Sequence, residues 1–273
     1  MKVKFFNKKL LLEFGKVFTA LNLILTTILI FVDIPNENKI KYAIAFIILN
    51  LIIYIFLLVR ANIKISASLN INNSIVDIKV GDIFEQDSLK VIPFNEYFDT
   101  NIKDGIISDK TLNGMYILKY ISDISALDKY IEEYDNIDDN LLDVNNGRKK
   151  GKKKKYSLGT IIKNNDFIYT AFSKFDDNNR AYIYLKDYVS FLFKFWDEID
   201  KVYNGESVVI PLFGTGITRF RDGSNFSEQE LLEIIIWSFK ISRIKFVYPS
   251  KVTILVTKEM ANKINFYKLG EVE

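Results

Sequence analysis

Two long apolar stretches near the start of the chain dominate its pattern of hydrophobic and polar positions. They cover residues 17–32 and 42–59, and neither contains a charged residue. At about 1.5 Å per residue of helix, each is just long enough to cross the ~30 Å hydrocarbon core of a bilayer. The short connection between them contains Pro35, which a helix interior does not tolerate. The pattern predicts a transmembrane hairpin in residues 1–61, followed by a second domain in residues 62–273.

A cleaved signal peptide and the buried hairpin of a soluble protein are the alternatives to a membrane hairpin. No small-residue cleavage site follows Val32, and a second apolar stretch begins almost at once. Residues 44–59 are apolar on every side of a helix apart from Asn50 and Tyr54, whereas a soluble helix keeps polar positions at helical spacing. A membrane hairpin is therefore the better interpretation.

The basic residues predict how this hairpin is oriented. Lysines occupy positions 2, 4, 8, 9 and 16 ahead of the first apolar stretch, and Arg60 and Lys64 follow the second. In the connecting loop, lysines and acidic residues balance each other. By the positive-inside rule, we expect a multi-pass protein with both termini in the cytoplasm.

From residue 62 onward, short apolar runs alternate with amphipathic stretches. Expected strands cover residues 63–69, 75–80, 90–93, 158–162, 167–172, 208–212 and 252–256. Expected helices cover residues 125–137, residues 185–202, a stretch after Ser227 and a short C-terminal segment. Ser227 and Glu230 have the spacing of a capping box. Strands interleaved with helices predict an α/β fold, a mixed sheet flanked by helices.

The strand expected at residues 208–212 leads into a glycine-containing loop. Two glycines at this spacing let backbone N–H groups turn toward one point and let a ligand approach closely. The hydroxyl and guanidinium groups of the loop suit a diphosphate, although Arg219 has an alternative, an ion pair with Asp222 or Glu228. A glycine pair alone is a weak signal, because many strand-to-helix turns contain one for packing. The loop consists of Gly214, Thr215, Gly216, Ile217, Thr218 and Arg219.

Composition narrows the chemistry. The chain has no cysteine and no histidine. Thiol nucleophiles, histidine general bases and histidine metal ligands are therefore excluded, and an enzyme would depend on carboxylate, lysine, tyrosine or serine groups. We expect no resident cofactor and no metal site.

Seven positive charges gather in residues 148–155, a segment called the basic run below. The whole chain carries +3, so the remainder carries −4, and no nucleic-acid partner is expected. The simplest interpretation is a solvated loop between a helix and a strand, with acidic residues between 128 and 143 as local partners. The alternative is attraction to anionic lipid headgroups, at about 1 kcal/mol per basic residue.

A second motif precedes the glycine loop by more than a hundred positions. Gly81-Asp82-Ile83 follows the strand expected at residues 75–80, and Asn95 follows the next strand. With the later proline and glycine loop, in the same order, these residues resemble the macro domain, an ADP-ribose-binding α/β fold. The resemblance implies that Asp82 accepts a hydrogen bond from the adenine amino group, that Asn95 faces the distal ribose, and that the glycine loop wraps the diphosphate. The implied ligand contacts are Asp82, Ile83, Asn95, Gly214, Thr215, Gly216, Ile217, Thr218 and Arg219.

Each of these side chains also has a structural alternative. Asp82 could cap the segment that follows it, because aspartate readily accepts local N–H bonds. Asn95 could be an ordinary strand-end asparagine. Tyr97 and Phe98 could stack on a base or sugar, but core packing is the better expectation in a chain so rich in aromatics.

The chain departs from ordinary macro domains at two points. Residues 96–103 replace the first glycine-rich loop, and Ile92 replaces the first asparagine of the usual strand-end pair. These departures argue against ADP-ribose hydrolysis and indicate a different group on the distal ribose.

Two apolar spans followed by this divergent macro domain resemble the membrane-anchored effectors of type II Thoeris antiphage systems. The resemblance covers nearly the whole chain, including residues 91–100. It implies a bacterial cell-membrane protein that senses histidine joined to ADP-ribose, a signal made by a companion TIR-domain enzyme during infection. It also implies that binding assembles a homo-oligomer that damages the lipid bilayer.

Three functions compete at this point. The leading hypothesis is a ligand-gated membrane effector that is not an enzyme. The second is a membrane-anchored ADP-ribose hydrolase. The third is a membrane scaffold that has lost its pocket, which would show Phe94 or Tyr97 filling the cleft.

Overall fold

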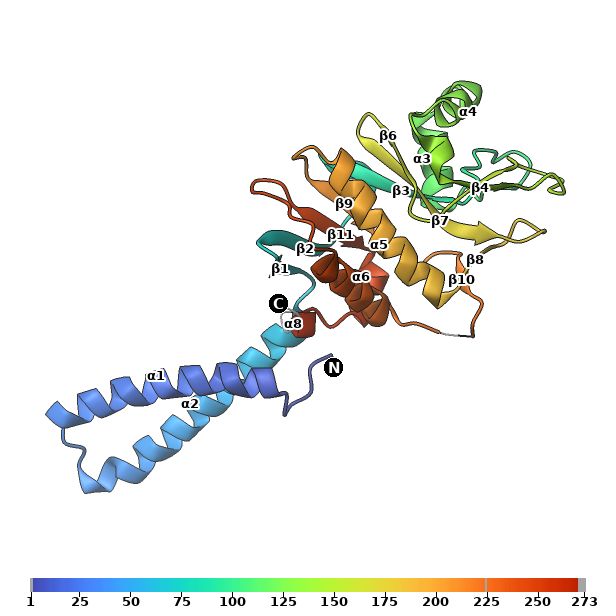
Figure 1. The fold of residues 1–273 in the computed structure, drawn as a ribbon. Helices are drawn as coiled ribbons and strands as arrows, with labels where there is room; N and C mark the ends of the chain where they lie inside the picture. The colour runs from blue at the N-terminus through green and yellow to red at the C-terminus, as the bar shows by residue number, and fades with distance from the viewer. Residues whose placement is uncertain (1, 224, 270–273) are drawn as a thin grey trace. The chain divides into compact units, whose positions relative to one another are not determined.

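A computed structural model describes residues 2–223 and 225–269 of the chain. These residues form two compact units, both drawn in Figure 1. The first unit contains the N-terminal residues through Ile65 together with Asn265–Lys268, and the second contains Ser66–Ile264.

The first unit is built on two helices, α1 (Lys8–Phe31) and α2 (Asn36–Ile63). Asn7 caps α1, because its side-chain oxygen accepts a hydrogen bond from the Leu10 amide at 3.1 Å. Pro35 is the residue before α2, where its missing N–H costs nothing. Both helices are long and apolar enough to cross a membrane, and most of their large hydrophobic side chains are exposed in the isolated chain.

The C-terminal segment Asn265–Lys268 packs on the helices of this first unit. The Asn265 side-chain amide donates to the Lys2 carbonyl at 2.8 Å, and Lys9 Nζ donates to the Tyr267 carbonyl at 2.9 Å. A small apolar cluster anchors the same contact, so residues from both ends of the sequence belong to one folded unit. The buried members of this cluster are Val3, Leu10, Tyr54, Ala61 and Tyr267.

The second unit is organised around a nine-stranded mixed sheet. Its strand order is β1-β2-β11-β9-β3-β7-β8-β10, and β6 pairs with β7. The strands β2, β11, β9, β3 and β7 run parallel to one another. The strands β1, β6 and β8 pair with this set in the antiparallel direction, and β10 runs parallel to β8. The strands are β1 (Ala67–Ile71), β2 (Ser74–Val80), β3 (Leu89–Asn95), β6 (Ile161–Asn164), β7 (Phe167–Phe175), β8 (Ala181–Ile183), β9 (Val208–Pro211), β10 (Arg219–Phe220) and β11 (Val252–Val256).

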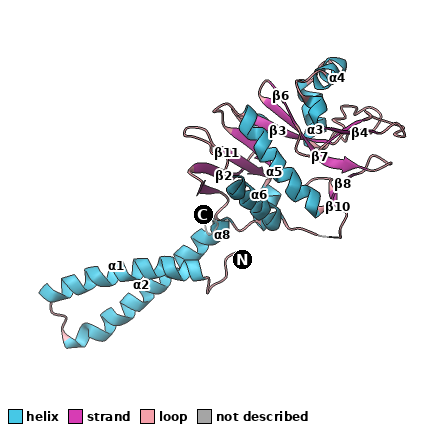
Figure 2. Ribbon diagram, in the orientation of Figure 1, coloured by secondary structure: helices cyan, strands magenta, loops and turns pink. Residues whose placement is uncertain are grey.

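Helices flank this sheet, and α5 and α6 lie side by side across one face of it (Figures 1 and 2). A separate two-stranded sheet pairs β4 with β5. The remaining elements are α3 (Leu112–Tyr120), α4 (Ile124–Glu132), α5 (Leu185–Val202), α6 (Glu228–Ser242), α7 (Lys258–Lys263), α8 (Phe266–Leu269), β4 (Leu141–Val144), β5 (Lys154–Tyr156) and the 3₁₀ turns η1 (Ile83–Glu85) and η2 (Ile137–Asn140).

Alternation along β7 shows that the sheet has a core on each face. Tyr169 and Ala171 belong to one buried cluster with Tyr116 of α3. Phe172 points the other way and packs against Phe191 of α5, with ring centroids 5.0 Å apart. Because neighbouring strand residues point to opposite faces, α3 and α5 cover opposite sides of the sheet. The expected α/β fold with a flanked mixed sheet is thus confirmed.

The structure corrects several expected elements. Ile63 is the last residue of α2, and the first strand begins at Ala67 rather than at residue 63. The helix expected at residues 125–137 ends at Glu132. Residues 154–156, at the end of the basic run, form β5 instead of a loop. The stretch after the glycine loop first forms β10 and only then α6, whose capping box is present as expected.

Candidate functional site

A large cavity opens at the carboxyl ends of the parallel strands. Its volume is 1480 Å³, and its wall includes Val80, Asn95, Pro211 and Val256, which are the last residues of β2, β3, β9 and β11. Ligands of open α/β sheets bind at this edge, where loops rather than side chains of the core face the solvent. The fold therefore places the candidate site where a parallel sheet offers one.

The structure brings every residue of the expected site to the wall of this one cavity. They come from three separate segments, the turn after β2, the end of β3 and the loop after β9. The residues are Asp82, Ile83, Asn95, Gly214, Thr215, Gly216, Ile217, Thr218 and Arg219.

Asp82 has a capping role in addition to its place on the wall. Its side chain accepts a hydrogen bond from the Phe84 amide at 2.9 Å and begins the turn η1. A carboxylate has about four lone-pair sites, so this bond leaves the exposed Asp82 side chain able to accept from a ligand. The next residue, Ile83, packs in the core against Val209 and Leu255, so only its backbone is suited to meet a polar group.

The glycine loop is held by its own backbone geometry. Gly214 has φ +88°, a left-handed conformation that a residue with a Cβ adopts only at a cost. The Thr215 hydroxyl donates to the Leu212 carbonyl at 2.8 Å and closes the turn. Gly216 has no atom within 4 Å of the position that a Cβ would take, so its place is open toward the cavity. Of the two glycines, only Gly214 is required by the backbone.

Arg219 is exposed at the start of β10. The two acids considered as its partners have other bonds: Asp222 accepts from the Leu185 amide at 2.8 Å, and Glu228 pairs with Lys263 at 2.5 Å. Arg219 lines the cavity wall together with the rest of the glycine loop.

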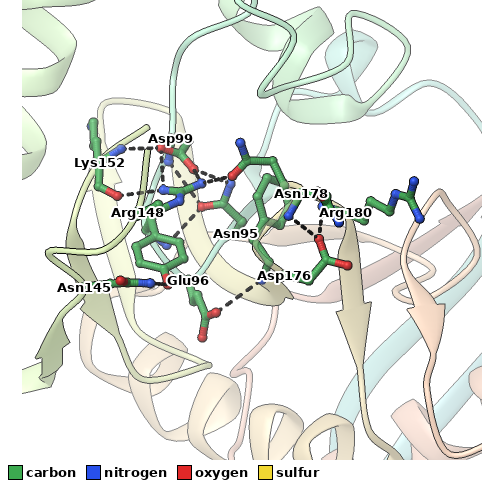
Figure 3. A network of polar contacts seen from close by, with 12 residues as sticks. Asn95, Glu96, Asp99, Asn145, Arg148, Lys152, Asp176, Asn178 and Arg180 are labelled. Atoms are coloured by element: carbon green, nitrogen blue, oxygen red, sulfur yellow. Dashed lines mark hydrogen bonds and ion pairs between the residues drawn. The ribbon is translucent and has the colours of Figure 1, made fainter. Parts of the chain in front are cut away.

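Asn95 is deeply buried, and most of its side-chain bonds lie inside the protein. Its oxygen accepts from the Tyr97 amide at 2.9 Å and from the Asp99 amide at 3.3 Å, and its Nδ2 donates to Asp99 Oδ2 at 2.9 Å. Figure 3 shows this side chain directed at Asp99, which in turn meets Arg148 of the basic run. A single N–H of the Asn95 amide is left over for the cavity.

The neighbouring acid, Glu96, is also buried, with a side chain that is 1% exposed. Burial raises the pKa of Glu96, and the charge of Lys155 acts in the opposite direction. Lys155 Nζ lies 3.4 Å from Glu96 Oε2, and the Phe175 amide donates to Glu96 Oε1 at 3.2 Å. The carboxylate thus ties the segment after β3 to β7 and to the end of the basic run.

The basic run is only partly a solvated loop. Acidic partners from the expected stretch are present, because Lys152 pairs with Asp128 at 2.6 Å and Lys154 with Asp138 at 3.2 Å. The expectation is wrong for Arg148, whose side chain is 6% exposed. The partner of Arg148 is the buried Asp99, which lies upstream of the acidic stretch from which local partners were expected. The exposed lysines of the run are Lys149, Lys150 and Lys153.

Two parts of the cavity wall had no signal in the sequence. One is the start of α3 with the turn before it, which contributes Thr111 and Asn113. The other is the turn between β7 and β8, where Asp176 pairs with Arg221 at 2.7 Å. The turn-forming residues 176–179 indicate a loop, but nothing in that pattern predicts a ligand site.

The aromatic residues near Asn95 do not block the cavity. Phe94 is 1% exposed and packs on Phe98 and Tyr169, with ring centroids 5.9 and 4.9 Å away. Tyr97 is buried beneath the guanidinium of Arg148. Core packing of Tyr97 and Phe98 is as expected, and the filled cleft that a scaffold without a pocket would show is not observed at these described residues.

Comparison with known proteins identifies the class of this fold. The family model described as "Thoeris protein ThsA, Macro domain" matches residues 76–257, which span the sheet from β2 to β11 and all three segments of the candidate site. The second unit is therefore a macro domain. A solved macrodomain mutant from Oceanobacillus iheyensis has a TM-score of 0.46 and 16% identity to the chain, and the match covers 76% of this chain and 92% of that one.

A relative that matches both units narrows the class to one family. Thoeris protein ThsA of Bacillus amyloliquefaciens (strain Y2) is 43% identical over 265 residues, covering 93% of this chain and 88% of the relative. This chain belongs to the ThsA family of Thoeris antiphage-defence proteins.

Proposed function

We propose that this member of the ThsA family is a membrane effector of antiphage defence that acts as a sensor and not as an enzyme. Its macro domain binds an ADP-ribose conjugate made by a TIR-domain enzyme, with histidine-ADP-ribose as the expected ligand. Ligand-bound copies then oligomerise and disrupt the inner membrane of the bacterial cell. Both termini and the macro domain face the cytoplasm.

The observation that carries this proposal is the convergence of three expected segments on one cavity. Asp82 follows β2, the glycine loop follows β9, and Asn95 ends β3. In the sheet order β2-β11-β9-β3, neighbouring strands lie about 4.8 Å apart, so Asp82 and Asn95 are separated by roughly 14 Å with the glycine loop between them. An acceptor, a loop of backbone amides and an amide donor in this order match adenine, diphosphate and distal ribose.

The size of the cavity supports a ligand larger than ADP-ribose alone. Most small-molecule pockets have volumes of roughly 300–1,000 Å³. At 1480 Å³, this cavity leaves room beyond the distal ribose for an attached group. That part of the wall is lined by Asp176, in the turn between β7 and β8, and by Arg221, which follows β10.

The small number of spans supports the proposed oligomerisation. Two helices cannot enclose a pore, so any effect on the bilayer requires several copies. In α1, the Asn22 side chain donates to the Phe18 carbonyl at 2.8 Å, and Thr26 bonds to the carbonyls of Asn22 and Leu23. These bonds are within one helix, and the second N–H and the oxygen of the Asn22 amide can serve a contact between copies, at about 0.6–2 kcal/mol each.

Binding can be tested on the full chain in lipid nanodiscs by titration calorimetry with ADP-ribose and with histidine-ADP-ribose. Asp82→Ala should weaken both ligands roughly tenfold, since one hydrogen bond to adenine is lost. Asp87→Ala is the matched control, because Asp87 is an exposed acid five residues away that does not line the cavity. Absence of binding for every ADP-ribose compound would refute the proposal, and release of free ADP-ribose from the conjugate would favour the hydrolase.

The membrane step can be tested in cells that co-express a TIR-domain enzyme and are challenged with phage. We expect loss of membrane potential with the unsubstituted chain and its retention with Asp82→Ala. Asn22→Leu should reduce crosslinked oligomers while leaving ligand affinity unchanged. Membrane damage that is independent of Asp82 would contradict the proposed gating.

A further inference from the structure

Two asparagines of the cavity wall, Asn95 and Asn179, bond to the same buried ion pair. Asn95 Nδ2 donates to Asp99 Oδ2 at 2.9 Å, and Arg148 Nη2 donates to the Asn179 side-chain oxygen at 2.7 Å. Asn95 ends β3 and Asn179 lies in the turn between β7 and β8, so these are separate parts of the wall. Asp99 and Arg148 lie behind them and do not line the cavity themselves.

The Asp99–Arg148 pair is fixed by an unusually complete set of bonds. It is bidentate, with Nη2–Oδ2 at 2.7 Å and Nη1–Oδ1 at 3.1 Å, and the two side chains are 1% and 6% exposed. The Lys152 amide donates to Asp99 Oδ1 at 2.8 Å, while Arg148 Nη1 donates to the Lys152 carbonyl at 2.6 Å (Figure 3). The guanidinium also lies 3.9 Å from the centre of the Tyr97 ring. Planar, bidentate pairing of this kind fixes orientation, which a lysine would not do.

This pair decides how the Asn95 amide is turned. The amide oxygen already accepts from two backbone N–H groups, and the carboxylate of Asp99 holds the nitrogen. Because a carboxylate accepts but cannot donate, the amide cannot flip without losing bonds at both ends. These bonds fix the direction of the remaining N–H of Asn95. The hydrogen bond from Arg148 fixes the Asn179 side chain in the same way.

The other end of the basic run is anchored to the same segment of chain. Lys155 pairs with the buried Glu96, and the Tyr156 amide donates to the Glu96 carbonyl at 2.8 Å. Arg148 and Lys155 thus attach both ends of the run to residues 96–99, which follow Asn95 directly. The segment that replaces the glycine-rich loop of ordinary macro domains is held from behind by the basic run.

We propose that Asp99 and Arg148 are positioning residues that orient Asn95 and Asn179 toward the distal ribose and the group attached to it. The inference rests on the proposed function, since it concerns the same cavity. It assigns a positioning role to Arg148, the first residue of the basic run. The sheet order places Asn95 and Asn179, the two side chains that this pair orients, on the far side of the glycine loop from Asp82, so the effect is confined to the distal half of the ligand.

This confinement makes the proposal testable with two probes, ADP and ADP-ribose, titrated into the full chain in nanodiscs. ADP carries the adenine and diphosphate but lacks the distal ribose. Arg148→Lys and Asp99→Asn should each lower the affinity for ADP-ribose roughly 5- to 30-fold, the factor that corresponds to one or two altered hydrogen bonds. The affinity for ADP should stay within about twofold, because the groups that hold adenine and diphosphate are untouched. Lys149→Met is the matched control, an exposed neighbour in the same run, and should change neither affinity.

Arg148→Lys retains the positive charge beside Asp99, so it avoids leaving a buried carboxylate without compensation and should fold. If Arg148→Lys and Asp99→Asn lower the affinities for ADP and ADP-ribose equally, the pair is a general structural support. That result, or unchanged affinity for both probes, would overturn this inference and leave the proposed function intact. If the unsubstituted chain binds neither ADP, nor ADP-ribose, nor histidine-ADP-ribose, the proposed function fails together with the inference.

Discussion

The two glycines of the loop provide a sharp test of how the backbone holds the candidate site. Gly214 has φ +88°, whereas Gly216 lies outside the left-handed region. A Cβ at position 214 would lie 3.4 Å from Leu231 and Phe220, a tight but tolerable contact, so the main cost of Gly214→Ala is the backbone conformation. That cost is about 1–2 kcal/mol for a residue with a Cβ.

Gly216→Ala is the matched control, because nothing lies within 4 Å of its Cβ position. Replacing glycine also restricts the unfolded chain, by about 0.4–1 kcal/mol, but this term is the same for both variants and cancels in their difference. Gly214→Ala should therefore be less stable than Gly216→Ala by about 1–2 kcal/mol. For a domain of this size, the difference corresponds to roughly 2–8 °C in Tm.

Tryptophan fluorescence during thermal unfolding of the full chain measures this difference directly. The chain has two tryptophans, Trp196 in α5 and Trp237 in α6, so the signal reports the macro domain and not the hairpin. If Gly214→Ala and Gly216→Ala unfold at the same temperature, the left-handed turn does not constrain the loop, and the assignment of Gly214 as the required glycine is wrong.

Three further predictions concern the wall, the buried acid and the hairpin. Tyr188→Phe removes a buried hydroxyl that donates to the Phe213 carbonyl at 3.1 Å, so the free energy of unfolding should fall by about 1–2 kcal/mol in urea titrations, and an unchanged midpoint would contradict this. Because burial raises the pKa of Glu96 above 4.5, the folded chain keeps a proton that the unfolded chain has lost, and this contribution to stability declines as pH rises above 4.5. Glu96→Gln lacks that decline, so its stability relative to the unsubstituted chain should increase as pH rises above 4.5; a constant difference would refute the raised pKa. Since the chain has no cysteine, Asn36→Cys in intact cells should react with an impermeant maleimide, and Lys4→Cys should react only after permeabilisation; the reverse pattern would invert the expected orientation.

Local patterns in the sequence predict the parts of the fold that depend on local chemistry. The helix α5 has the expected bounds of residues 185–202 because its apolar residues recur at helical spacing along its whole length. The helix α3 was missed because it begins with Leu112, Asn113 and Gly114, and asparagine and glycine disfavour helices. Gly114 is required there by a tertiary contact: a Cβ would lie 2.1 Å from the Ser108 carbonyl oxygen.

The candidate site also contains residues that local patterns predict and residues that depend on the tertiary fold. Short motifs predict the residues of the glycine loop and Asp82, and all of them reach the cavity wall. The ion pair between Asp99 and Arg148 joins residues 49 positions apart. In the sequence, nothing distinguishes Asp99 from other loop aspartates or Arg148 from the neighbouring basic residues. Such a pair depends on how the tertiary fold brings the segment after β3 and the basic run together, so no local pattern predicts it.

The segment Asn265–Lys268 gives the macro domain two attachments to the hairpin unit instead of one. The chain leaves that unit at Ile65 and re-enters it at Asn265, so the macro domain is an insertion between two parts of the same folded unit. A domain on a single linker can swivel without deforming what it is tied to. Here the chain joins the two units at residues 65–66 and again at residues 264–265. The second attachment is short, because Thr257, Lys258 and Met260 line the cavity and only residues 261–264 lie between Met260 and Asn265.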